Sequence, residues 1–232
     1  MTVPTSLDEV INQAKTATQV ALDAGINRIQ IEILLPDLQV MPLAWSYLEL
    51  FQDLGVHLKV FFADAGAAAL ARRDWQNPIF SVRGVNELLE PVQDSDQAFV
   101  CITPSPVEVS YIEQMCNAAG NRPFILLNPK LQDVAIVGIG YAGRQLRERF
   151  LNTLETAYYI RPLDDTTALL RAYPGDWEIW RDVNGEYQRL GATPAKPSGE
   201  QIDKVLYGEQ AETPGGGGFF ASMQRFLKAL QQ

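Results

Sequence analysis

The chain has 232 residues, of which 47% are hydrophobic, and its formal net charge at pH 7 is −9. A chain of this length buries enough apolar surface to fold without a disulfide or a metal ion. The acidic balance disfavours binding to the phosphate backbone of nucleic acids. No apolar run approaches the roughly 20 residues of a membrane span. We therefore expect a cytoplasmic protein, with peripheral attachment to a membrane as the alternative.

The first half of the sequence alternates between helical and strand patterns. Residues 6–25 begin with Ser6 and Glu9 in capping-box spacing and continue with helical periodicity. Ile29, Ile31 and Ile33 then alternate with polar residues, which is typical of a strand. Further helices are predicted over 43–55, 67–75 and 105–120, and further strands within 56–66, 78–84, 97–104 and 123–129. Strands separated by helices predict an α/β fold, with a mostly parallel sheet and helices on both faces.

The second half changes character. The pattern predicts a strand over 133–139, a helix over 144–155 and a strand over 156–163. Two turn signals, Pro174-Gly175-Asp176 and Asn184-Gly185, then indicate an antiparallel meander. We predict a single α/β domain with this antiparallel extension over 1–191, a flexible linker over 192–218 and an amphipathic helix over 219–232.

A glycine-rich stretch raises the question of nucleotide binding. Gly138, Gly140 and Gly143 match the dinucleotide fingerprint G-x-G-x-x-G, Arg144 follows at a helix start, and Asp164 or Asp165 has the spacing of a ribose ligand. However, the stretch comes late in the domain, and the meander that follows replaces the second half of a nucleotide-binding unit. Glycines at a strand end also serve tight turns. We favour the turn and keep a nucleotide-binding protein or enzyme as the alternative.

Polar residues follow several predicted strands, where parallel sheets usually bind ligands. They are Asp37, Asp64, Ser105, Asn128 and Lys130. The two carboxylates suit Mg²⁺ and a phosphate, but helix caps and turns explain the same residue types. His57 is the only histidine, and Cys101 and Cys116 lack zinc-site spacing and are expected to be reduced core residues. We therefore predict no catalytic set, no metal site and no cofactor.

The C-terminal end combines a flexible tether, Gly215–Gly218, with an apolar stripe. Three alternatives are open: the stripe folds back on the core, binds a groove of a partner, or lies on a membrane surface. The stripe consists of Phe219, Phe220, Met223, Phe226, Leu227 and Leu230.

Several stretches together resemble a known family. They include "SLDEVINQAKTATQVAL", "IQIEILLPDL", "VFFADAGAAALARR", "LLNP", "VGIGYAGRQLRERFLNTLETAYYIRPL", "PGDWEIW" with "YQRL", and "FFASMQRFLKAL". The resemblance is to the domain-of-unknown-function 1995 family of cyanobacteria and chloroplasts, which includes the low-photosystem-II-accumulation proteins. It implies a role in photosystem II assembly at the thylakoid, with a protein partner in the photosynthetic apparatus. It implies no catalytic residues.

Overall fold

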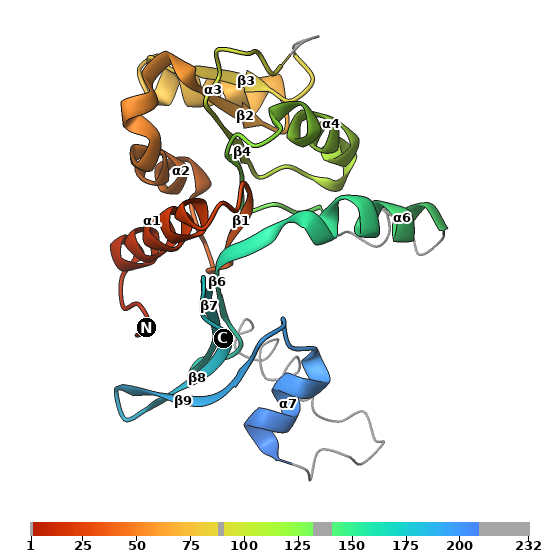
Figure 1. Cartoon of the computed structure of the whole chain (residues 1–232). Helices are drawn as coiled ribbons and strands as arrows, with labels where there is room; N and C mark the ends of the chain where they lie inside the picture. The colour runs from red at the N-terminus through yellow and green to blue at the C-terminus, as the bar shows by residue number, and fades with distance from the viewer. Residues whose placement is uncertain (1, 88–90, 132–140, 209–232) are drawn as a thin grey trace, which may run out of the picture. The chain divides into compact units, whose positions relative to one another are not determined.

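The computed structural model describes residues 2–87, 91–131 and 141–208 (Figure 1). The chain divides into two units, with the boundary between Ala195 and Lys196. The first unit contains all the described strands, which form one nine-stranded sheet in the order β3-β2-β4-β5-β1-β6-β7-β8-β9. The strands are β1 (Arg28–Ile33), β2 (Leu58–Phe62), β3 (Ser81–Gly84), β4 (Ala98–Ile102), β5 (Phe124–Leu127), β6 (Glu155–Pro162), β7 (Thr167–Ala172), β8 (Trp177–Val183) and β9 (Glu186–Thr193).

The predicted fold class is confirmed. The six strands β3-β2-β4-β5-β1-β6 pair in parallel with their neighbours. Strands β6, β7, β8 and β9 pair antiparallel as the predicted meander. Strand β1 lies between β5 and β6 and pairs with both. The turn between β8 and β9 has positive φ at Asn184 (58°) and Gly185 (89°), the backbone that an Asn-Gly hairpin turn requires.

Helices cover both faces of the parallel part. One face packs against α1 (Leu7–Asp23), α2 (Val40–Leu48), the 3-10 helix η1 (Glu49–His57) and α3 (Ala65–Asp74). The opposite face packs against α4 (Val109–Ala119), which follows the 3-10 helix η2 (Pro106–Glu108), and against α6 (Tyr141–Arg149) and η3 (Leu151–Thr153). Successive side chains of a strand point to opposite faces. Val60 and Val100 therefore join the first core, whereas Phe61 and Cys101 join the second.

Buried hydroxyl groups fix α1 and, through it, α2. The Tyr158 hydroxyl on β6 donates to Gln13 Oε1 at 3.0 Å. The hydroxyls of Thr18 and Tyr47 lie 2.7 Å apart and link α1 to α2. Burial raises the pKa of the Tyr47 phenol, so it stays protonated and available for this bond. The last turn of α2, which contains Tyr47, thus has a defined place above the sheet.

Two predicted helices are shorter than the periodicity indicates. The segment predicted as a helix to Gly55 is α-helical only to Leu48 and continues as the 3-10 helix η1. In the second case, Phe150 leaves helical geometry (φ −130°) and its side chain is fully buried in the core, so α6 ends at Arg149. The strand predicted over 133–139 lies outside the described residues.

The second unit contains α7 (Gly199–Tyr207), which falls inside the segment predicted to be a flexible linker. Ser198 and Gln201 form a capping box: the Ser198 Oγ accepts from Gln201 N at 3.3 Å, and Ser198 N donates to Gln201 Oε1 at 2.8 Å. Residues 199–207 are therefore helical. The predicted tail helix lies outside the described residues. Within the described ranges, no helix combines the length and hydropathy needed to cross a membrane.

Candidate functional site

The carboxyl edge of the parallel strands carries most of the polar residues predicted to bind a ligand. Strand β2 leads through α3 to β3, whereas its neighbour β4 leads through η2 and α4 to β5, in the opposite direction along the sheet. A crevice at such a switch point is where open α/β sheets usually bind ligands. Asp64 follows β2 and Ser105 follows β4, so the topology brings these two predicted residues to the same edge of the sheet.

Both residues act as helix caps. Asp64 Oδ1 accepts from Ala67 N at 2.9 Å at the start of α3. Ser105 forms a capping box with Glu108: Oγ and N of Ser105 lie 2.5 and 2.9 Å from Glu108 Oε2, and Val107 N donates to Ser105 Oγ at 3.2 Å. These hydrogen bonds satisfy the first turns of the two helices.

Asn128 extends the sheet. Its Oδ1 accepts from Ile33 N at 2.6 Å, its Nδ2 donates to Ile33 O at 3.1 Å, and its own N donates to Ile31 O at 2.7 Å. The residue is 7% exposed and has a φ of 49°. Its side-chain amide thus continues the pairing of β5 with β1, and both of its polar atoms are occupied by the backbone.

The remaining predicted crevice residues are exposed. Asp37 has a φ of 54° and lies in the turn after β1. The backbone N of Lys130 donates to Pro104 O at 2.8 Å and joins the segments that follow β4 and β5. In the described ranges, no three His, Cys, Asp or Glu side chains form a cluster suited to a metal ion.

The predicted nucleotide fingerprint is only partly described. Gly138 and Gly140 lie outside the described residues, whereas Gly143 is buried and Arg144 exposed on α6. Asp164 Oδ1 accepts from Thr166 N and Thr167 N, each at 2.8 Å, and from Thr166 Oγ1 at 3.1 Å. Partial burial raises the pKa of Asp164, but these hydrogen bonds outweigh it and the pKa is lowered overall. Asp164 therefore shapes the turn between β6 and β7.

The two cysteines are free and buried, as predicted. Burial raises the pKa of the Cys116 thiol to about 12 and that of Cys101 well above its usual value. Neither thiol is therefore a ready nucleophile.

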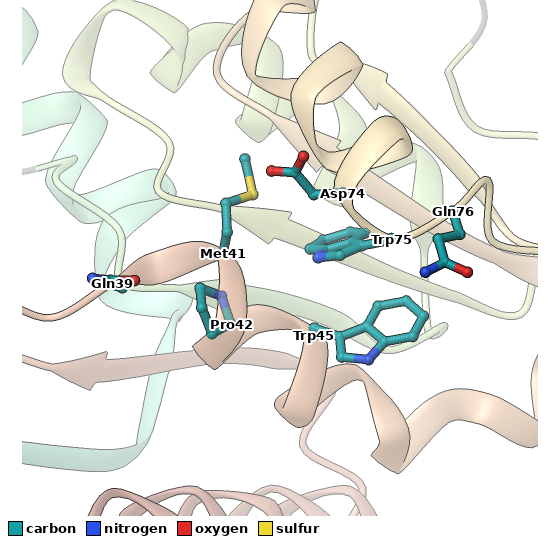
Figure 2. A pocket seen from close by; sticks show the side chains of 7 residues that line it. All are labelled: Gln39, Met41, Pro42, Trp45, Asp74, Trp75 and Gln76. Atoms are coloured by element: carbon teal, nitrogen blue, oxygen red, sulfur yellow. The ribbon is translucent and has the colours of Figure 1, made fainter.

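The structure also reveals a hollow that the sequence did not indicate. It lies between the start of α2 and the end of α3 and has a volume of about 570 Å³ (Figure 2). We call it the aromatic hollow; it is lined by Gln39, Met41, Pro42, Trp45, Asp74, Trp75 and Gln76.

Two tryptophans dominate this hollow. The ring centroids of Trp45 and Trp75 lie 5.4 Å apart, with 36° between the ring planes. Trp75 is 8% exposed and also contacts Phe62 (5.7 Å) and Phe80 (6.4 Å). Trp45 is 42% exposed. One indole therefore belongs to the core, and the other presents a large apolar surface to solvent.

Comparison with known protein families gives a match over most of the chain. A family model described as domain of unknown function (DUF1995) matches residues 4–204. The chain belongs to the DUF1995 family. The match confirms the resemblance noted in the sequence. It covers the nine-stranded sheet, the carboxyl edge and every residue that lines the aromatic hollow.

The match ends at residue 204, before the apolar tail of this DUF1995 protein begins. The predicted contact residues Phe219 to Leu230 lie beyond both the matched range and the described residues. The aromatic hollow therefore lies inside the matched range, whereas the tail lies outside it.

Replacement of Asn128 tests its role at the sheet edge. Asn128→Ala leaves Ile33 N–H and C=O without their buried partners, so we expect it to lower the free energy of unfolding by about 2–4 kcal/mol. Urea denaturation measures the change. Lys130→Ala, at an exposed position two residues away, is the control and is expected to change stability by less than about 0.5 kcal/mol. Equal effects of both variants would contradict the assignment.

Proposed function

We propose that this DUF1995 protein is a non-enzymatic assembly or docking factor associated with the photosynthetic (thylakoid) membrane, acting in photosystem II biogenesis. Chloroplast proteins that resemble it assist photosystem II assembly at the thylakoid. The observation that carries a docking role is the aromatic hollow, where a 42% exposed tryptophan lies against a buried one.

A half-exposed tryptophan of this kind is suited to protein recognition. Tryptophan is enriched among the residues that contribute most to protein–protein binding, because one rigid ring buries a large area on docking. The ring of the half-buried Phe80 lies 6.3 Å from that of Trp45, and Ile79, the residue before Phe80, is 73% exposed. Docking of a partner that removes these apolar groups from water lowers the free energy of the complex.

The side chains at the carboxyl edge of the sheet support the non-enzymatic part of the proposal. Asp64, Ser105, Asn128 and Asp164 each form hydrogen bonds that hold a helix start, a strand pair or a turn. A general base needs a lone pair that faces the substrate, and a metal ligand needs one that faces the metal ion. At least one polar atom of each of these side chains instead bonds to the backbone or to a neighbouring side chain, so a structural role accounts for its position.

Affinity purification tests the docking role. The full-length chain is used as bait in a detergent-solubilised cyanobacterial thylakoid lysate, and we expect photosystem II subunits or their precursors to be enriched. Trp45→Ala is expected to reduce this recovery about tenfold or more, because loss of a central tryptophan commonly costs about 2 kcal/mol of binding.

The control for this experiment is Leu70→Ala. Leu70 lies on α3, is 48% exposed and does not line the hollow. It should leave the recovery unchanged. The proposal fails if no photosystem II component is enriched, and the hollow is excluded as the docking surface if both variants recover the same amount.

Membrane association is assigned in this proposal to the apolar tail, with Phe219, Phe226 and Leu230 among its contacts. A chain that ends at residue 214 should lose co-sedimentation with thylakoid membranes, because the tail supplies the apolar residues and two cations next to them. Sedimentation of the truncated and full-length chains with the same membranes measures this. Unchanged sedimentation would remove the tail from the proposal.

The nucleotide-binding alternative makes a different prediction. A ligand present at 100 times its dissociation constant raises the free energy of unfolding by roughly 2.7 kcal/mol. We expect no shift of the melting temperature with NAD, NADP, ATP or ADP at millimolar concentration. A shift with any of them, lost in Arg144→Ala, would favour nucleotide binding at residues 138–144.

A further inference from the structure

The chemistry of the aromatic hollow indicates what kind of group it accepts. Its apolar surface comes from Trp45, Trp75, Met41 and Pro42, and its polar groups are the Asp74 carboxylate and the amides of two glutamines. Neither lysine nor arginine lines it. An anionic ligand would therefore meet a carboxylate, with no cation among the lining residues, and a purely apolar ligand would cover the second oxygen of that carboxylate and the two amides without giving them a hydrogen-bond donor or acceptor.

The Asp74 carboxylate has one oxygen left for a ligand. Its Oδ1 accepts from Arg73 Nε at 2.8 Å and lies 2.7 Å from Arg73 Nη2. No described residue donates to Oδ2, and the side chain is 44% exposed. Figure 2 shows the carboxylate of Asp74 directed toward the side of the hollow where Met41 lies.

The end of α3 holds this arrangement in place. Gln76 and Asn77 both have a φ of 55°, so the chain turns sharply after Trp75. Gln76 N donates to Arg73 O at 3.2 Å and Asn77 N to Arg72 O at 2.8 Å, which satisfies the last carbonyls of the helix. On the other side of α3, Arg72 Nη1 donates to Val82 O at 2.6 Å and ties the helix to β3. These hydrogen bonds fix the end of α3, where Asp74, Trp75 and Gln76 follow one another.

We propose that the aromatic hollow binds an arginine side chain presented by a partner protein. This inference rests on the proposed docking function and names the chemistry of the partner. A guanidinium is planar, stacks on the face of an indole and pairs with a carboxylate through a fork of N–H donors. Trp45 supplies the face and Asp74 Oδ2 an acceptor, and Gln39 and Gln76 are the other polar residues that line the hollow.

Charge and size agree with this occupant. The net charge of −9 attracts a cationic segment over a longer range than the contact itself. The volume of about 570 Å³ lies within the range of roughly 300–1,000 Å³ of small-ligand pockets, which leaves room for the residues that flank one arginine. Arginine fits better than lysine because a guanidinium is more weakly hydrated and presents a flat face to Trp45.

Short peptides and NMR test the proposal on the full-length protein. The probe is the peptide Ac-Gly-Ala-Arg-Ala-Gly-amide, and the signals are the indole N–H resonances of the four tryptophans. We expect saturable shifts for Trp45 and Trp75, with those of Trp177 and Trp180 unchanged. The same peptide with citrulline, which has nearly the same shape without the charge, should bind at least fivefold more weakly, and one with glutamate should not bind.

Variants separate the contributions of stacking and charge. Trp45→Ala should abolish binding, and Asp74→Asn should weaken it about three- to tenfold. Arg73→Ala removes the cation that competes for Asp74 and should strengthen binding. Leu70→Ala is the matched control and should bind as the unchanged protein does. Dispersed amide spectra of each variant show that it is folded.

Several results would overturn the inference. They are equal binding of the arginine and citrulline peptides, shifts confined to Trp177 and Trp180, or a response of Trp45 to maltose or to lipid vesicles but to none of the peptides. If Trp45→Ala still abolishes recovery of photosystem II components while the arginine peptide does not bind, the docking function stands and the arginine assignment is wrong. If the peptide binds but no such component is recovered, the hollow recognises arginine and the proposed function is wrong.

Discussion

The parallel pairing of β1 with both β5 and β6 is the constraint on which the rest of the structure depends. The first strand of the chain closes the sheet at its centre, so two halves that are distant in sequence become one core. Asn128 completes this junction by bonding to Ile33 across 95 positions of the sequence. The antiparallel strands β7, β8 and β9 attach through β6, and hence through β1. Such non-local pairing carries a large entropic cost before its contacts form.

The same topology places the proposed docking surface away from the carboxyl edge of the sheet. The carboxyl edge, where α/β proteins usually bind ligands, is here occupied by hydrogen bonds that hold Asp64, Ser105 and Asn128 against their own backbone. The long crossover from β1 to β2 instead places α2 beside the end of α3. There, one tryptophan completes the core and its neighbour faces solvent. The candidate site therefore lies on the helical layer and not at the end of the sheet.

Local features of this fold were predictable and non-local ones were not. The Ser105–Glu108 capping box, the alternation of Ile29, Ile31 and Ile33, and the Asn-Gly turn depend on residues within a few positions, and the structure contains them. Of the predicted Ser6–Glu9 box only the Ser6 cap forms, because the Glu9 carboxylate accepts from Thr5 instead. Strand order depends on pairing between distant segments, about which periodicity contains no information. For the same reason Trp45 and Trp75, 30 positions apart, looked like ordinary helix residues, and Asn128 looked like a turn residue before a proline. The early end of α6 at Phe150 reflects core packing overriding helical propensity.

The two outermost strands of the sheet have a consequence for colloidal behaviour. Strand β3 has only four residues, and β9 is interrupted by an irregularity opposite Ile179 and Trp180 and carries Glu186 and Arg189. Short, charged or distorted rims are poor templates for strand addition by another molecule. A protein whose interior is this rich in buried β-structure is thereby guarded against polymerising into fibrils, even when it is crowded.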